Sequence, residues 1–354
     1  VHSWIGHWSG GLAVATILSC AIFASISGSS VATAATIGTV AIPAMVARGY
    51  ERRFVYGLLA AGGTIGILIP PSIPMIVFGF VISESIIDLF LAGIGPGLLL
   101  TAVFIVYAVL RARLGGGHEP SPKASWAERR RATARAAPSL GLAALIVFGI
   151  YFGAFTPTEA AGVGFVAALV ITLLIRRTLT LGQLPAIALA STKTSVMVLF
   201  IIAGAKIFGH AVTLYQIPQD VTALVVGSLT GPIGFIAAIC ALLLVMGCVL
   251  ETLSMMLLML PIIHPSLASL GIDPIWFGVL FTMMIECALI TPPVGLNLFV
   301  IQAVAREGGE SGDSRPAAIG DVVHGVLPFV GLILLCLVVV VLVPDIALYI
   351  PFKL

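Results

Sequence analysis

Charged residues are scarce in this sequence. Asp, Glu, Lys and Arg make up 9% of its 354 residues, while hydrophobic residues make up 60%. A soluble domain carries about 25% charged residues, so this composition excludes an ordinary soluble domain. The apolar runs are continuous rather than alternating, which argues against a transmembrane β-barrel. We therefore expect an all-α polytopic membrane protein.

Motifs for metal binding, nucleotide binding and hydrolysis are also missing. The sequence has no CxxC pair, no HExxH motif, no DDxxD-type acid pair and no Walker A loop. The Gly-Ser-Ser run at 28–30 is not a GxSxG elbow. We therefore predict no enzyme activity and no cofactor, with an ion gradient as the energy source. The cysteines lie in apolar runs and are interpreted as core residues. They are Cys20, Cys240, Cys248, Cys287 and Cys336.

Long apolar stretches follow one another along the chain. One helical crossing needs about 20 residues, so the stretches at 11–47 and 221–270 are long enough for two legs each. The stretches run approximately over residues 11–47, 54–82, 89–110, 138–155, 160–175, 185–213, 221–270, 275–304 and 318–343.

Basic residues gather in four groups between these stretches, at residues 48–53, 111–135, 176–177 and 306–315. The positive-inside rule assigns the four groups to the cytoplasm. Acidic residues lie instead at the intervening ends of the stretches. They are Glu84, Asp88, Glu159, Asp220, Asp273 and Asp345.

The membrane side assigned to each basic group constrains how many times the chain crosses the membrane between them. Stretch 185–213 leaves the cytoplasm, and 275–304 must return to it from outside. Stretch 221–270 must therefore begin and end outside, which predicts a re-entrant hairpin or a pair of helices. Stretch 11–47 ends at cytoplasmic Arg48, and we expect it to fold likewise, entering from the inside.

Matched landmarks indicate an internal repeat. Three pairs of Gly or Pro residues have nearly one spacing, and one predicted hairpin enters from each side of the membrane. The two halves therefore have inverted topology, which is typical of secondary transporters that bind substrate between their repeats. The pairs, with separations of 219, 218 and 222 residues, are Gly28 with Gly247, Pro43 with Pro261, and Pro70 with Pro292.

Each half also places a Pro-Pro pair inside an apolar stretch, TIGILIPPSIP at 64–74 and LITPPVG at 289–295. Proline removes a backbone donor and obstructs a helix. Free backbone groups within a membrane are tolerated only inside protein or beside a water-filled cavity. We interpret the pairs as helix breaks whose carbonyls and amides bind a cation or an anion. A proline kink that only shapes packing is the alternative.

Polar residues cluster near the predicted hairpin tips. The stretch 24–38 is rich in Ser and Thr, whose hydroxyls suit sodium, although close helix packing would also use small residues. The second tip, at 247–254, carries Glu251. Glu251 and Glu286 are intramembrane acids, read as cation partners, proton carriers or acids satisfied by local amides. Asn297 is expected to cap the restarted helix or to face the substrate.

Five long segments, in order over essentially the whole chain, closely resemble the large membrane subunit of TRAP (tripartite ATP-independent periplasmic) transporters. They are ISGSSVATAATIGTVAIPAM, AAGGTIGILIPPSIPMI, FTPTEAAGVG, GIDPIWFG and ECALITPPVGLNLFV. The resemblance implies a bacterial or archaeal inner-membrane importer of organic acids, such as C4-dicarboxylates or sialic acid. It implies sodium as the coupling ion and an elevator fold with inverted repeats, two re-entrant hairpins and two broken helices.

The same resemblance implies partners. They are a small four-helix membrane subunit and a periplasmic binding protein that delivers the organic acid, with no role for nucleic acid. The family's large subunit has further N-terminal helices, so we expect such helices to precede residue 1. The implied organisation is a first repeat at 1–88, a scaffold at 89–215 with a basic cytoplasmic loop at 111–135, a second repeat at 216–305, and a loop with the final transmembrane helix at 306–354.

Sodium sites in this family lie at the hairpin tips and the facing breaks. Carried over, the first site comprises Ser27, Gly28, Ser29, Ser30, Gly66, Ile69 and Pro70. The second comprises Gly247, Glu251, Thr252, Ala288, Thr291 and Pro292. Substrate contacts are expected from Ser30, Thr33, Pro71, Pro293 and Asn297. Glu251 departs from the pattern, because many relatives carry Asp at that position.

Three alternatives remain open from the sequence. One is a stand-alone ion-coupled carboxylate or anion transporter with similar hairpins. Another is a membrane enzyme that uses Glu251 and Glu286 as a carboxylate pair. The third is a structural scaffold within a larger complex.

Overall fold

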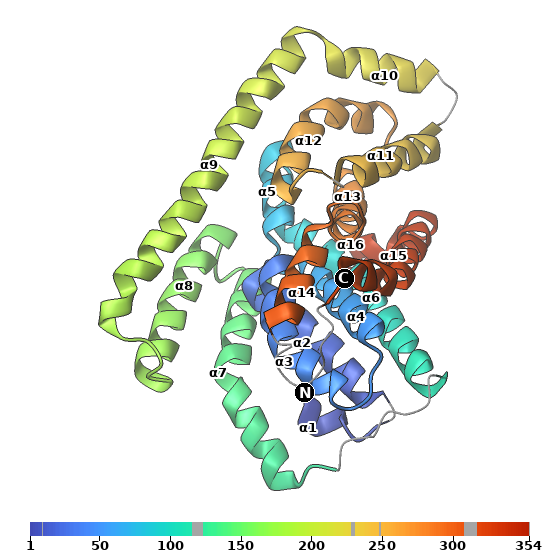
Figure 1. Ribbon diagram of the computed structural model, residues 1–354. Helices are drawn as coiled ribbons and strands as arrows, with labels where there is room; N and C mark the ends of the chain where they lie inside the picture. The colour runs from blue at the N-terminus through green and yellow to red at the C-terminus, as the bar shows by residue number, and fades with distance from the viewer. Residues whose placement is uncertain (9, 115–122, 228–230, 248, 308–316, 354) are drawn as a thin grey trace.

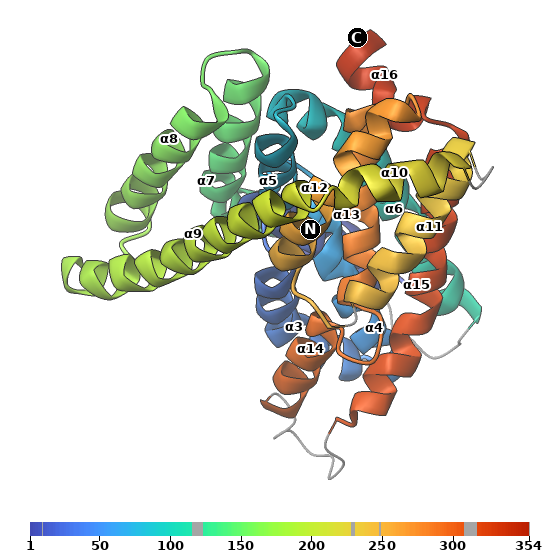
Figure 2. The ribbon, with the colours of Figure 1, turned by 90° about the horizontal axis from the view of Figure 1, so that it is seen from above.

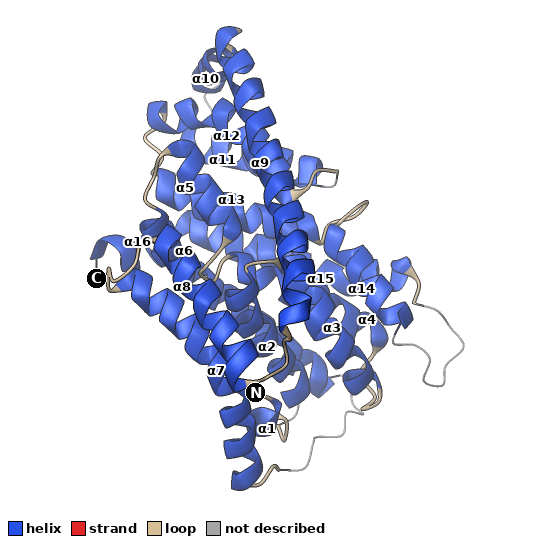
Figure 3. Ribbon diagram, turned by 90° about the vertical axis from the view of Figure 1, so that its left-hand side faces the viewer, coloured by secondary structure: helices blue, strands red, loops and turns tan. Residues whose placement is uncertain are grey.

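The computed structural model describes residues 1–8, 10–114, 123–227, 231–247, 249–307 and 317–353. In this part of the chain every regular element is a helix (Figures 1 and 3). Six helical segments are long and apolar enough to cross a membrane, which confirms the prediction of an all-helical polytopic membrane protein. They are Ile86–Leu114, Trp126–Tyr151, Pro157–Ile175, Leu181–Leu214, Thr252–Ser269 and Ile319–Leu342.

The first half opens with a helical hairpin whose tip is two residues long. Helix α2 (Gly11–Ser27) ends at Gly28, which is left-handed with a φ of 62°. Glycine adopts that conformation at no steric cost, so the chain can reverse there. Ser29 then caps helix α3 (Ser30–Val46), because its side chain accepts a hydrogen bond from a backbone N–H of the first turn. Local sequence therefore determines the geometry of this tip.

A helix interrupted by the first Pro-Pro pair follows the hairpin. Helix α4 (Arg52–Thr64) passes into the 3₁₀ turn η1 (Ile65–Ile67), and the chain becomes helical again in α5 (Ile73–Ile82). The Pro70–Pro71 peptide bond is cis. Ser72 caps α5 through its side chain, so the helix restarts with its own cap.

The second half repeats this order of elements. Glu251 caps the second arm of its hairpin, where the first half uses Ser29. The Pro292–Pro293 bond is also cis. The elements are α11 (Gly231–Gly247), α12 (Thr252–Ser269), α13 (Pro274–Leu289) and α14 (Leu296–Glu307).

The helix starts give the repeat one register. Three kinds of matching position lie 222 residues apart in the chain: the caps of the second hairpin arms, the first residues of the following helices, and the first prolines of the Pro-Pro pairs. These are Ser29 with Glu251, Arg52 with Pro274, and Pro70 with Pro292.

This register corrects two of the predicted landmark pairs. Pro43 corresponds to Pro265 rather than to Pro261, because Pro43 and Pro265 hold the same position within α3 and α12. In this register Gly247 lies opposite Ser25 rather than Gly28. The prediction matched the two glycines by residue type, but Gly28 forms a left-handed tip whereas Gly247 is the last residue of α11.

Helices α7, α8 and α9 form an arm beside the other helices (Figures 1 and 2). In the most apolar 18 residues of these three spans, 6%, 6% and 0% of the residues are buried, against 50% for α6. The arm therefore turns its apolar surface outward, toward lipid or another chain. These elements are α6 (Ile86–Leu114), α7 (Trp126–Tyr151), α8 (Pro157–Val170) with the π-helical turn η2 (Ile171–Ile175), η3 (Leu181–Gln183) and α9 (Leu184–Leu214).

The basic segment 111–135 is partly helical and not the loop that was predicted. Helix α6 continues to Leu114, and α7 begins at Trp126. A capping box starts α7: the Ser125 side chain accepts from the Glu128 N–H, and Glu128 accepts from the Ser125 N–H at 2.7 Å. Dense charge indicates exposure to water, but it does not prevent a helix.

Three helices were not predicted as separate elements. They are α1 (His2–Ile5), α10 (Ile217–Gly227) and α16 (Asp345–Lys353). Stretch 221–270 accordingly holds parts of three helices instead of two. The predicted final crossing at 318–343 is α15 (Ile319–Leu342), which packs along α4.

Candidate functional site

A cavity of about 130 Å³ lies between the two hairpin tips. Residues from both tips and from both breaks line it, so segments far apart in the chain meet at one place. The lining residues are Gly28, Ser29, Ser30, Val31, Ile67, Ile73, Pro74, Glu251, Thr252, Leu253, Leu289 and Leu296.

Four helices begin at this cavity. Their first residues all line it, two from the hairpin tips and two from the restarts after the Pro-Pro pairs. A helix N-terminus presents free N–H groups and about half a positive charge. Four such ends around one space favour an anion without any basic side chain. The first residues are Ser30 of α3, Ile73 of α5, Thr252 of α12 and Leu296 of α14.

Among the described residues that line the cavity, the one charged side chain is that of the acid Glu251, and no Lys, Arg or His is present. The Glu251 carboxylate accepts hydrogen bonds from the N–H and the hydroxyl of Ser254 at 3.3 and 3.4 Å. It thus occupies the N-terminus of its own helix, α12, while the neutral Ser29 leaves the N-terminus of α3 available to a ligand.

Hydroxyl and carbonyl oxygens come together at the first tip. The Ser27 and Thr33 hydroxyls lie 3.1 Å apart, and the Thr33 hydroxyl donates to the Ser29 carbonyl at 2.8 Å. Thr33 is fully buried, directly behind the cavity-lining Ser29 and Ser30. The structure thereby groups these four residues, all of which were predicted to bind sodium or substrate.

Asn297 links the second break to the first hairpin. Its Nδ2 donates to the Ser30 hydroxyl at 2.6 Å and to the Ala60 carbonyl at 3.1 Å. Asn297 is fully buried, and its Oδ1 has no hydrogen-bond partner within the described residues. It lies inside α14, not at its cap, and it does not line the cavity. It reaches the tip through Ser30.

Each break packs against the hairpin of its own half at a point where one residue has no side chain. Gly66 of the first break meets Ala24 of α2, and Gly247 of α11 meets Ala288 beside the second break. The same contact thus occurs in both halves with glycine and alanine exchanged. These contacts place the breaks close behind the tips.

The remaining predicted residues lie around these contacts. The Pro71 carbonyl approaches Gly28, whereas Pro70 and Pro71 also adjoin Tyr151 of the arm. The Thr291 hydroxyl, just beyond the end of α13, donates to the Cys287 carbonyl of that helix at 2.6 Å. Ile69 and Pro292 are half-buried, and Pro293 is exposed, all outside the set that lines the cavity.

Glu286 is separate from Glu251. It is fully buried in α13, beside the backbone N–H of Leu68 in the first break, and neither of its oxygens makes a hydrogen bond of normal geometry. It does not line the cavity to which Glu251 contributes. The two acids therefore do not form the carboxylate pair that the enzyme alternative required.

Sequence reasoning missed the apolar half of the lining. Val31, Ile67, Leu253 and Leu289 resemble any other membrane residue in type and spacing, so they gave no signal. Residues at helix restarts, such as Ile73, could have been found from the Pro-Pro pair and the Ser cap that precede them.

A sequence profile of one protein family matches residues 1–346. The family is described as "Tripartite ATP-independent periplasmic transporter, DctM component". Three curated relatives are named large permease proteins of TRAP transporters. One, for C4-dicarboxylate, comes from Pseudomonas aeruginosa and is 39% identical over 350 residues. Another, for ectoine, comes from Halomonas elongata and is 35% identical over 349 residues.

The third relative, for 2,3-diketo-L-gulonate, comes from Escherichia coli and is 34% identical over 352 residues. Each alignment covers 99% of this chain and 79% of the relative.

Proposed function

Because the chain belongs to the DctM family of TRAP transporters, we propose that it is the large permease subunit of a sodium-coupled importer of an organic acid. The observation that carries this proposal is the convergence of four helix N-termini on one cavity that has no basic side chain. A carboxylate held by N–H groups and hydroxyls is bound without the strong ion pair that would slow its release.

The proposed substrate carries at least one carboxylate. Relatives are named for C4-dicarboxylate, ectoine and 2,3-diketo-L-gulonate transport. In this chain the carboxylate would face α3, where Ser29 and Ser30 offer hydroxyls and a helix N-terminus not occupied by an acid. The opposite tip, with the Glu251 carboxylate in its cap, would face the remainder of the substrate.

Sodium is proposed to bind behind the tips. The oxygens of Ser27, Ser29 and Thr33 lie within hydrogen-bonding distance of one another, and a hard cation prefers such oxygen donors. A bound sodium ion would hold the tip against its break and add positive charge next to the anion site. Substrate affinity would then depend on sodium, which is the requirement for coupling.

An elevator movement is proposed for transport. The two repeats, residues 1–88 and 216–305, would move together against the scaffold at 89–215. The hairpins would be re-entrant, so that their tips meet within the membrane and the cavity opens to either side in turn. The outward apolar surface of the arm would bind the small membrane subunit and lipid, and a periplasmic binding protein would deliver the substrate.

Uptake into proteoliposomes tests the proposal. The protein is reconstituted with its small subunit and binding protein, and labelled organic acids are supplied under an inward sodium or potassium gradient. Uptake should require sodium and the binding protein. Ser27→Ala removes one hydroxyl oxygen of the proposed sodium site and should raise the sodium concentration for half-maximal uptake about tenfold or more, since a hydrogen bond to a charged group is worth about 1.5–3 kcal/mol.

Thr291→Ala should also weaken sodium dependence, and Thr192→Ala is its matched control. Each threonine hydroxyl donates to the carbonyl four residues earlier, but Thr291 lies in the second break whereas Thr192 lies within α9 on the exposed arm. Sodium-independent uptake contradicts the coupling ion. Uptake without the binding protein indicates a stand-alone transporter.

A further inference from the structure

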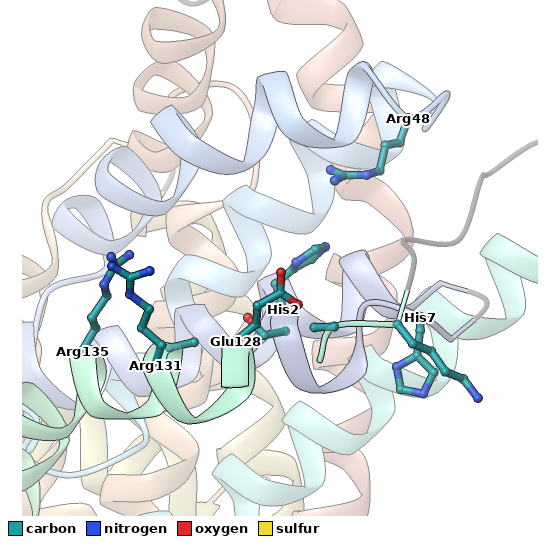
Figure 4. Close-up of a pocket in the computed structure, with 10 residues that line it drawn as sticks. His2, His7, Arg48, Glu128, Arg131 and Arg135 are labelled. Atoms are coloured by element: carbon teal, nitrogen blue, oxygen red, sulfur yellow. The ribbon is translucent and has the colours of Figure 1, made fainter. Parts of the chain in front are cut away.

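A second cavity lies far from the hairpin tips, where α1, the link after α3 and the start of α7 meet. Figure 4 shows Arg48, Arg131 and Arg135 around it, with His2, His7 and Glu128. Its volume is about 580 Å³, and Lys123 completes its charged lining. None of these residues contributes to the cavity between the tips.

The charges in this cavity are unbalanced. Among the described residues that line it, four are basic, namely Arg48, Lys123, Arg131 and Arg135, and one is acidic. That acid, Glu128, already accepts hydrogen bonds from the N–H and hydroxyl of Ser125 at 2.7 and 3.0 Å. Within the described residues none of the four cations forms an ion pair.

Neighbouring groups add to the positive field. Arg176, at the end of the π-helical turn η2, donates to the backbone carbonyl of Arg135. Burial and the adjacent Arg48 lower the pKa of His2. Among the described residues the cavity therefore lacks a counter-anion, and it disfavours further positive charge.

Aromatic residues place this cavity at a membrane surface. The rings of Trp4 and Trp126 meet edge to face with centroids 5.8 Å apart, and the Arg129 guanidinium lies over both. Tryptophan concentrates at the boundary between lipid and water. Helix α7 carries the basic residues in its first turns and its apolar span beyond them. The positive-inside rule puts this end in the cytoplasm.

We propose that this cavity binds the anionic headgroup of a phospholipid from the cytoplasmic leaflet. A phosphate group accepts paired hydrogen bonds from a guanidinium, and Arg131 with Arg135 stand one turn apart on α7 to supply them. Free phosphate offers the same oxygens but no acyl chains, whereas the neighbouring tryptophans lie at headgroup depth. The lipid joins Arg48, at the base of the first hairpin, to α7 of the arm.

The test uses the full protein in nanodiscs of phosphatidylcholine with or without phosphatidylglycerol, with retained lipid measured by native mass spectrometry. Phosphatidylglycerol should be retained preferentially. Arg131→Gln and Arg135→Gln should each weaken retention about tenfold, because each removes a direct charge-assisted hydrogen bond to the headgroup and a tenfold change corresponds to about 1.4 kcal/mol. Arg130→Gln is the matched control, because Arg130 lies on the same helix but does not line the cavity.

Two further measurements keep the result clear. Thermal unfolding in pure phosphatidylcholine must be unchanged in the variants. The pKa of His2, followed by NMR, should rise when phosphatidylglycerol is present, because an anion favours the charged imidazole. Equal losses in Arg130→Gln, or no preference for the anionic lipid, overturn the proposal. Displacement of the lipid by millimolar inorganic phosphate would assign the site to a free anion and overturn the lipid.

Discussion

Single glycine and alanine positions determine how closely each hairpin approaches its break. Gly247 leaves room for the Ala288 side chain, and Gly66 leaves room for Ala24. A methyl group added at either glycine would overlap its alanine partner, and well-packed helices accommodate such overlap at a cost of about 1–3 kcal/mol.

Gly247→Ala should therefore lower thermal stability, and Ala288→Gly in the same chain should restore most of it. Once the Ala288 methyl is gone, the nearest atom to the new side chain is the residue-288 Cα at 3.4 Å, which is ordinary contact. The matching exchange in the first half, Gly66→Ala with Ala24→Gly, should restore less, because the Ala24 Cα remains at 2.8 Å. Thermal unfolding of the purified variants measures both. Equal rescue in the two halves would contradict this geometry.

Asn297 carries the buried hydrogen bonds between the two halves. Asn297→Ala removes the donors to Ser30 and Ala60 and should destabilise the protein by about 1–3 kcal/mol. Ser30→Ala should cost less, because it removes only one partner. The double variant should be less destabilised than the sum of the single variants, since both remove the same bond. Full additivity in thermal unfolding would show that the two side chains act independently.

At the scale of elements, two kinds of contact stabilise the crossing of α4 and α15. One is close backbone packing and the other is an ion pair. Gly57 and Gly325 allow the two backbones to touch, as small residues do in membrane helix pairs. Arg53 and Asp321 form a salt bridge of 2.8 Å on the same crossing, with side chains 56% and 38% exposed. An exposed pair contributes about 0.2–1 kcal/mol, so the close packing should dominate.

Gly325→Ala should accordingly lower the unfolding temperature more than Asp321→Asn. A side chain at position 325 would strike the backbone of Arg53, which cannot rotate away. Gly331→Ala is the control on the same helix, because nothing lies within 4 Å of its new side chain. It should not lower stability, because alanine favours a helix more than glycine does. A larger effect from Asp321→Asn would make the ion pair the principal contact of this crossing.

At the scale of the whole molecule, helix α9 of the arm contacts residues of both repeats. A Cβ atom added at Gly209 of α9 would lie 3.4 Å from the Pro261 Cβ of α12. The Lys206 ammonium, also on α9, lies 5.5 Å from the centroid of the Phe80 ring. The proposed elevator movement would separate these contacts, because α9 belongs to the scaffold and α12 to the moving repeats.

A disulfide between Gly209→Cys and Pro261→Cys, in a chain without other cysteines, should therefore arrest uptake. Its Cβ atoms lie at about the separation that a disulfide needs. Reduction should restore transport. The control joins Gly62→Cys to native Cys20, with Cβ atoms 3.5 Å apart and both within the first repeat, so uptake should continue. Unchanged uptake across the closed 209–261 bridge would contradict movement of α12 along α9.

Much of the architecture was accessible from local patterns. Apolar length and the distribution of Arg and Lys indicated a polytopic helical protein, and Gly28 with Ser29 indicated the first tip. The register of the repeat was less accessible, since Gly247 looked like Gly28 by type but packs against its break as Ala24 does in the first half. Residue type does not reveal which atom a position must accommodate.

The sequence by itself determined that this chain is a helical membrane protein, where some of its helices are capped, and to which family it belongs. Those properties depend on the transfer of side chains into lipid and on caps formed within a few residues. Only the tertiary structure decided that four helix starts meet at one cavity, that Asn297 bonds to Ser30, and that Arg48 faces Arg131 across a basic cavity. Such groupings arise from the packing of distant helices, which no local pattern encodes.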